Sequence, residues 1–71
     1  MAAHKEKILK LLKKSKPLTD EEIADKLSIS PNTERPRRLE LEEAGLVVAC
    51  GFALTKAGKR ALLWTASERL L

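Results

Sequence analysis

The chain has 71 residues, a length that predicts one small domain spanning residues 1–71. With 44% hydrophobic and 34% charged residues, its composition is that of a compact water-soluble protein rather than a disordered tail or a membrane protein. Its single cysteine, Cys50, and single histidine, His4, exclude an internal disulfide and a zinc site built from these ligands. No apolar run approaches the ~18 residues that span a bilayer, and the first residues lack the apolar core of a signal peptide. We therefore expect a cytoplasmic protein without metal, cofactor or membrane partner.

The net charge of +4 is distributed unevenly along the chain. Residues 1–16 contain six lysines and one glutamate, residues 17–29 are acidic, and the last third is basic again. Such segregation can produce one positive and one negative face. Taken alone, it fits a nucleic-acid partner and a solvated surface of mixed sign equally well.

Two helices are predicted in the first half of the chain. Apolar residues recur at helical spacing among lysines over about residues 3–14, and Pro17 cannot continue that helix. Thr19 followed by Glu22 has the spacing of a capping box, which predicts the start of a second, short helix over about residues 20–28.

A third helix is predicted over about residues 33–44, with Gly45 at its end because glycine adopts the left-handed conformation readily. Pro36 limits where this helix can begin. If Ser30 were the N-cap, Pro36 would remove a backbone hydrogen bond in the second turn, at up to ~3 kcal/mol, or kink the helix. If Thr33 is the N-cap, the missing N–H costs little, so we favour Thr33.

The pattern changes after Gly45. Residues 46–49 are β-prone, Cys50 and Gly51 can turn, and residues 52–54 can form a short second strand. The apolar spacing from Thr55 onward fits a helix, and it also fits the returning strand of a β-hairpin. Periodicity does not decide between the two.

Three segments together resemble winged helix-turn-helix proteins, most of all small phage- and prophage-encoded ones. They are Leu18-Thr19-Asp20-Glu21-Glu22-Ile23-Ala24, Ser30-Pro31-Asn32-Thr33 and Pro36-Arg37-Arg38-Leu39-Glu40-Leu41-Glu42-Glu43-Ala44-Gly45-Leu46-Val47. The likeness extends to Trp64, with Gly51, Leu54-Thr55 and Gly58-Lys59-Arg60-Ala61 close to the family's wing pattern. The resemblance implies a mainly α (α+β) fold of three helices and a small C-terminal β-wing over about residues 46–66. In that fold residues 61–65 are the last wing strand.

Glu34 departs from the pattern, which has valine or another apolar residue at this position. A carboxylate that faces a small core is unfavourable. Either Arg37 or Arg38, three and four residues further on, pairs with Glu34, or the helix begins later and leaves Glu34 in solvent.

The resemblance implies a module that binds double-stranded DNA, of phage or prophage type, acting in transcriptional control or replication initiation. The N-terminal part of the third helix would enter the major groove, where arginine reads guanine and asparagine reads adenine, while wing cations hold flanking phosphates. The candidate DNA contacts are Ser30, Asn32, Thr33, Arg35, Arg37, Arg38, Lys56, Lys59 and Arg60. Thr33 is equally suited to capping alone, and Arg37 or Arg38 to pairing with Glu34 or Glu42.

Other functions compete with this one. A winged-helix domain that has lost DNA binding would present its acidic helix residues to a basic protein, and structured RNA is a third candidate partner. No nucleophile–base pair, phosphate-binding loop or metal cluster is evident, so we expect no enzyme. Tight operator binding by so small a domain calls for a homodimer or an additional partner. The sequence does not specify the operator or the oligomeric state.

Overall fold

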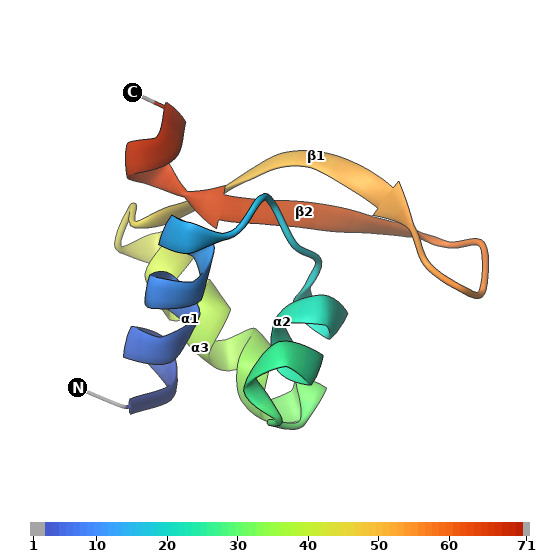
Figure 1. Ribbon diagram of the computed structural model, residues 1–71, viewed down its shortest axis with the longest axis horizontal. Helices are drawn as coiled ribbons and strands as arrows, with labels where there is room; N and C mark the ends of the chain where they lie inside the picture. Colours follow the sequence, from blue (N-terminus) through green and yellow to red (C-terminus); the bar gives the residue numbers. More distant parts are fainter. Residues whose placement is uncertain (1–2, 71) are drawn as a thin grey trace.

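The computed structural model describes residues 3–70 as three helices followed by a β-hairpin. The elements are α1 (Ala3–Lys14), α2 (Asp20–Leu27), α3 (Pro31–Glu43), β1 (Val47–Leu54), β2 (Arg60–Ala66) and a short 3-10 helix, η1 (Ser67–Leu70). The helices gather at one end of the molecule, and the hairpin passes over α2 and projects beyond it (Figure 1). The predicted fold class is therefore confirmed. Residues 61–65 form a strand, which decides between the two alternatives that the sequence left open.

The start of α2 follows from its local sequence. The backbone N–H of Glu22 donates to Thr19 Oγ1 at 3.2 Å, and the backbone N–H of Thr19 donates to Glu22 Oε1 at 3.0 Å, which completes the predicted capping box. The helix ends at Ser28, which adopts the left-handed conformation with φ 55° and turns the chain toward α3.

The start of α3 differs from the prediction. Ser30, and not Thr33, is the N-cap, and its Oγ accepts a hydrogen bond from the backbone N–H of Thr33 at 3.2 Å. Pro31 occupies the first helical position, where its fixed φ favours the helix and no N–H is needed. Pro36 lies inside the helix and leaves the carbonyl of Asn32 without its helical donor. Because Asn32 is exposed, water can supply that hydrogen bond, and the cost we expected from this proline is reduced.

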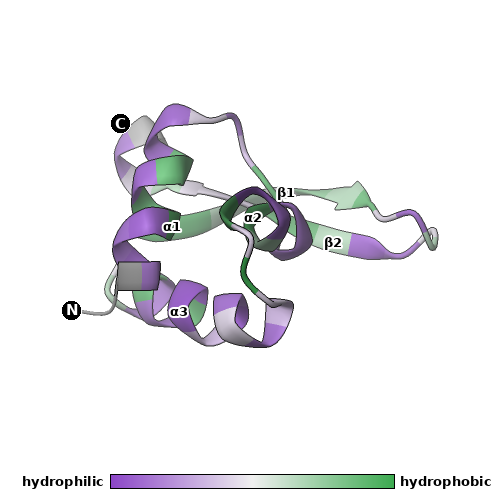
Figure 2. Cartoon of the chain, turned by 60° about the horizontal axis from the view of Figure 1, so that its bottom comes forward, coloured by the Kyte–Doolittle hydropathy of each residue, from purple (hydrophilic) through white to green (hydrophobic). Residues whose placement is uncertain are grey.

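The core is a single cluster between the three helices and the base of the hairpin. Its buried members are Ile8, Leu12, Leu18, Ile23, Leu41, Val47, Trp64 and Ala66. Helix α3 contributes little apolar surface to this core, and Figure 2 shows it as mostly hydrophilic beside the green stretches of α1 and the hairpin. The position of α3 must therefore depend on more than apolar burial.

Strand β2 is held on both sides. It pairs antiparallel with β1 from Val47↔Ala66 to Leu54↔Arg60, with a bulge at Cys50 between Ala49 and Gly51. On its other side, Leu18 and Trp64 exchange backbone hydrogen bonds of 2.7 and 3.1 Å. These two bonds fasten the hairpin to the segment between α1 and α2, while the pairing with β1 holds residues 61–65 as a strand.

The Ser30 cap can be tested by Ser30→Ala, which removes the side-chain acceptor at the start of α3. We expect the free energy of unfolding to fall by about 1 kcal/mol, as for other N-cap serines. Urea unfolding followed by circular dichroism measures the change, and Ser28→Ala is the matched control because Ser28 caps no helix N-terminus. An equal effect of both substitutions would contradict the assignment of Ser30 as the cap.

Candidate nucleic-acid interface

The exposed start of α3 and the wing, by which we mean β1, β2 and the turn between them, form one concave surface. A hollow of about 420 Å³, bordered by Asp20, Glu21 and Arg38, is also lined by three basic residues: Arg35 of α3 and Lys59 and Arg60 of the wing. All three side chains are exposed, and no ion pair involving them is found among the described residues. The structure thus brings together four of the predicted contact residues, these three and Arg38, from two parts of the chain.

The other predicted residues at the start of α3 differ in availability. Asn32 is exposed, one turn before Arg35 on the same side of the helix. The hydroxyls of Ser30 and Thr33 lie 3.0 Å from each other, and Ser30 also accepts the backbone N–H of Thr33. The side chains of Ser30 and Thr33 thus make hydrogen bonds at the N-terminus of the helix. Among the predicted contact residues at this end of α3, Asn32 and Arg35 are therefore more available to a ligand.

Lys56 lies on the turn of the wing and faces a different hollow. This second hollow, of about 220 Å³, is lined by Lys56 and Leu54 together with Glu21, Glu22 and Asp25 of α2. Lys56 is exposed, but carboxylates lie across from it. The wing cations therefore divide between the hollow with Arg35, which Asp20 and Glu21 also line, and the hollow beside Glu21, Glu22 and Asp25.

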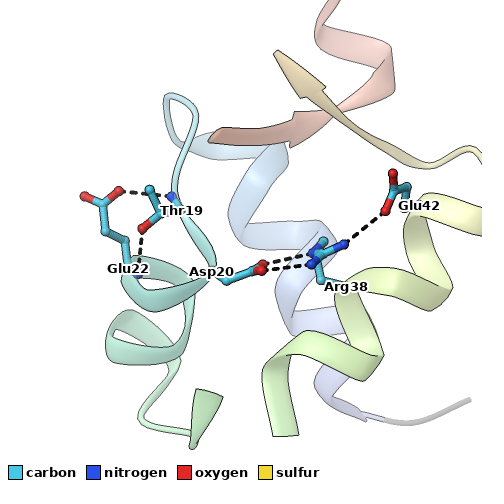
Figure 3. Close-up of polar contacts among 5 residues, drawn as sticks. All are labelled: Thr19, Asp20, Glu22, Arg38 and Glu42. Atoms are coloured by element: carbon cyan, nitrogen blue, oxygen red, sulfur yellow. Dashed lines mark hydrogen bonds and ion pairs between the residues drawn. The ribbon is translucent and has the colours of Figure 1, made fainter. Parts of the chain in front are cut away.

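Arg38 is committed to contacts inside the protein. Its Nε and Nη2 donate to the two carboxylate oxygens of Asp20 at 2.9 Å each, and its Nη1 donates to Glu42 at 3.0 Å (Figure 3). Its guanidinium also lies 4.0 Å from the ring centre of Trp64, and its side chain is only 14% exposed. A bidentate pair combined with stacking on an indole is the arrangement for which the planar guanidinium is best suited. Arg38 therefore links α2, α3 and β2 and has few free donors for a ligand.

Arg37 forms an ion pair that is more exposed than those of Arg38. Its Nη1 contacts both carboxylate oxygens of Glu40, at 2.9 and 3.2 Å, within the same helix. The Arg37 side chain is 39% exposed, so this pair is screened by solvent and easily exchanged for another partner. Arg37 stays a predicted contact residue at the edge of the surface.

Glu34 follows neither of the two expectations from the sequence. It forms no ion pair with Arg37 or Arg38 among the described residues, and it does not lie in solvent: its exposed fraction is 0%. Neither of its carboxyl oxygens accepts a hydrogen bond. Because Ser30 rather than Thr33 begins α3, Glu34 falls in the first turn of the helix, near Asp20 of α2.

Burial raises the pKa of Glu34 from 4.5 to about 8. Loss of hydration is the largest cause, and the neighbouring carboxylate of Asp20 adds to it, both by attracting the proton and by its negative charge. Arg38 and Arg35 oppose the rise without cancelling it. The Glu34 carboxyl is consequently neutral for the most part at pH 7, which makes its burial tolerable.

The described part of the chain offers neither a metal centre nor a membrane-spanning helix. Residues 3–70 contain no group of three or more histidine, cysteine, aspartate or glutamate side chains placed to hold a metal ion. Within the same range, every helix is too short or too polar to cross a bilayer.

Comparison with known proteins adds one structural relationship. No protein-family model matches the chain, and no curated protein is significantly similar to it. Among solved structures, it is similar to a cysteine-to-serine mutant of ZitR from Lactococcus lactis, with a TM-score of 0.75 and 28% sequence identity. The similarity covers 100% of this chain, which spans 46% of that protein.

The chain has the winged helix-turn-helix fold. The turn between α2 and α3 joins the two helices of the motif, and the wing follows α3 directly. Asp20, which sequence reasoning did not place in the site, is the residue that fixes α2 to α3. Its only signal in the sequence was a negative charge in the first turn of a helix, where the helix dipole alone accounts for it.

Arg38→Ala and Arg37→Ala form a matched pair of tests. We expect Arg38→Ala to lower the free energy of unfolding by about 2–4 kcal/mol, because it leaves Asp20 without its partner in a partly buried site. Arg37→Ala should cost less than about 1 kcal/mol, since its pair with Glu40 is exposed. Urea unfolding followed by the fluorescence of Trp64, the only tryptophan, measures both.

Should Arg38→Ala fail to fold, Arg38→Lys gives the same information. Lysine keeps the charge but loses both the bidentate contact and the stacking on Trp64, so an intermediate loss is expected. Equal stability of the Arg37 and Arg38 variants would show that the Asp20 contact does not hold α2 to α3.

The raised pKa of Glu34 predicts a dependence of stability on pH. A carboxyl whose folded-state pKa lies above its unfolded value contributes stability that is complete below the unfolded value of 4.5 and declines as the pH rises toward about 8. We expect a loss on the order of a few kcal/mol across this window, at about 1.4 kcal/mol per pKa unit. Glu34→Gln should remove this decline.

Thermal and urea unfolding between pH 5 and 8.5 would measure the effect. Glu43→Gln, a change at an exposed glutamate of the same helix, is the control and should retain the decline of the unaltered protein. A profile unaffected by Glu34→Gln would mean that Glu34 titrates normally.

Proposed function

We propose that this chain is a module that binds double-stranded DNA, with the start of α3 in the major groove and the wing against the adjoining strand. The observation that carries the proposal is the shared hollow lined by Arg35, Lys59 and Arg60. These cations come from the two elements that a winged helix-turn-helix places against DNA, and none of them is used in an ion pair among the described residues.

Asn32 and Arg35 are the proposed base contacts. They lie on the exposed face of the first two turns of α3, and their side chains suit adenine and guanine edges, respectively. Lys59 and Arg60 are the proposed phosphate contacts, with Lys56 and Arg37 at the edges. Ser30 and Thr33 would act through the helix N-terminus that they cap, and Arg38 through the position of α3.

The biological role rests on the sequence resemblance alone. It is that of a phage- or prophage-type regulator of transcription or of replication initiation, acting in the cytoplasm and without catalysis. Because a single small module covers limited DNA surface, tight binding would need a second copy or a further segment.

A protein partner is the second candidate. Glu21, Glu22 and Asp25 gather beside the smaller hollow under the wing, where a basic peptide would find carboxylates. Glu21 lines both hollows, whereas Glu22 and Asp25 line only the smaller one, so substitutions at Glu22 and Asp25 address the second candidate separately.

The test is a titration with a short duplex of random sequence, followed by NMR at ~50 and ~200 mM salt, where counterion release predicts weaker binding at the higher concentration. We expect the amide signals of Asn32, Arg35, Lys59 and Arg60 to shift. Arg35→Gln and Lys59→Gln should each weaken binding, and Lys59→Gln should lower the slope of log K against log salt by about 0.9.

Lys14→Gln is the matched control. Lys14 is exposed at the end of α1, at the other end of the molecule from the projecting wing (Figure 1), and its loss should leave the affinity nearly unchanged. A folded protein whose amide signals do not move at either salt concentration would exclude the proposal, and a search for a basic protein partner of α2 would follow.

A further inference from the structure

Glu34 lies next to the candidate interface but makes none of the contacts proposed so far. Its exposed fraction is 0%, and neither of its carboxyl oxygens accepts a hydrogen bond. An apolar residue at this position would fill the space without a polar group to bury. A buried ionisable side chain beside a binding surface is therefore a candidate functional group.

The partner of Glu34 is Asp20, and the bond between them needs a proton. The side chain of Asp20 is hydrogen-bonded to the Glu34 carboxyl. Two carboxylates cannot form such a bond, because an ionised carboxyl group is only an acceptor. Both oxygens of Asp20 already accept N–H groups of Arg38 at 2.9 Å, which favours the ionised form of Asp20 (Figure 3). The proton therefore resides on Glu34, which donates to Asp20.

The charges that act on this bond come from α2 and α3. Burial is the largest cause of the raised pKa of Glu34, and Asp20 adds to it. The cations Arg38 and Arg35 oppose the rise. Of the other elements packed against α3, α1 contributes Lys5, which pairs further along the helix, and β1 contains no charged residue. The protonation of Glu34 is therefore balanced between Asp20 and the two arginines.

The same groups border the surface that we assign to DNA. The charged residues that line the hollow of about 420 Å³ are Asp20, Glu21, Arg35, Arg38, Lys59 and Arg60. Arg35 directly follows Glu34 in the chain. A phosphate bound in the hollow engages the arginines that would otherwise stabilise an ionised Glu34, and it adds a negative charge of its own. Bound DNA and the proton on Glu34 thus favour each other, as linkage requires.

We propose that Glu34 is a proton-dependent positioning residue of the DNA interface: its protonated carboxyl holds α3 to Asp20, and its ionisation weakens duplex binding. The inference rests on the proposed DNA-binding function and adds a means of control to it. Ionisation removes the hydrogen bond, places two carboxylates side by side and makes both of them compete for Arg38. The contact that positions Arg35 is then loosened, and the new negative charge behind Arg35 reduces its attraction for phosphate.

The experiment measures the affinity for a short labelled duplex of random sequence by fluorescence anisotropy, from about pH 6.5 to about pH 9 at one low salt concentration. Because burial raises the pKa of Glu34 to about 8, affinity should fall as the pH rises through this value. We expect the dissociation constant of the unaltered protein to increase about 5-fold or more, as is typical of coupling between two sites.

Glu34→Gln is the decisive variant, because glutamine has the same shape and a hydrogen-bond donor but does not ionise. It should bind at pH ~9 as tightly as the unaltered protein binds at pH ~6.5. Three controls should retain the pH dependence of the unaltered protein. Glu43→Gln alters an exposed carboxyl of the same helix, while Cys50→Ser and His4→Gln remove the only thiol and the only imidazole of the chain.

A second readout follows the contact itself without DNA. The Nε–H of Arg38 donates to Asp20, and its NMR signal reports that bond. We expect this signal to shift as Glu34 ionises near pH 8, together with the carboxyl carbon signal of Glu34, and to stay unchanged in Glu34→Gln. Trp64 fluorescence verifies at each pH that the protein is folded.

If Glu34→Gln does not fold, calorimetry of the unaltered protein in two buffers of different ionisation enthalpy tests the same linkage. Duplex binding near pH 8 should take up a fraction of a proton per chain, because DNA favours the protonated form of Glu34. Binding without proton uptake would contradict the proposal.

Three further results would overturn it. An affinity that is independent of pH, or a dependence that persists in Glu34→Gln, excludes the role of Glu34 while the proposed function stands. An Arg38 signal that does not respond when Glu34 ionises excludes the positioning role. Failure of the unaltered protein to bind a duplex at any pH would remove the proposed function and this inference with it, even where the Arg38 signal responds to pH.

Discussion

The bidentate contact between Asp20 and Arg38 fixes the relation between the two helices of the motif. Helix α3 offers the core almost no apolar surface beyond Leu41, so burial alone does not determine its position. Two hydrogen bonds of 2.9 Å to the first residue of α2, together with stacking on Trp64, supply the missing constraint. Arg35 lies one turn before Arg38 on the same helix, and its distance from the wing is therefore set by the same contact.

The contact between α2 and α3 contains a third ionisable group, Glu34, beside the ion pair of Asp20 and Arg38. Asp20 and Arg38 form an ion pair, and Glu34 beside them is buried with neither carboxyl oxygen accepting a hydrogen bond. A proton on Glu34 keeps the cluster neutral, which is the state that a poorly hydrated site favours. The raised pKa of Glu34 therefore allows the folded protein to bury this carboxyl in its neutral form.

Local chemistry was sufficient to predict some elements and insufficient for others. The capping box at Thr19 was predictable because its two hydrogen bonds join residues three apart. The start of α3 was not, because the cost of Pro36 depends on whether water reaches the carbonyl it leaves free, and this is a property of the folded surface. The strand at residues 61–65 and the partner of Arg38 depend on Leu18 and Asp20, which are distant in sequence, so no pattern within either segment contains them.

The bulge at Cys50 divides the hairpin into two parts that should differ in their tolerance of substitution. On the core side of the bulge, Val47, Trp64 and Ala66 are buried, and a replacement there would have to be accommodated by all three helices at once. Beyond the bulge, the side chains are mostly exposed and the strands are held by their own pairing and by the turn. Substitutions of single residues in the outer wing should therefore leave the rest of the fold as it is.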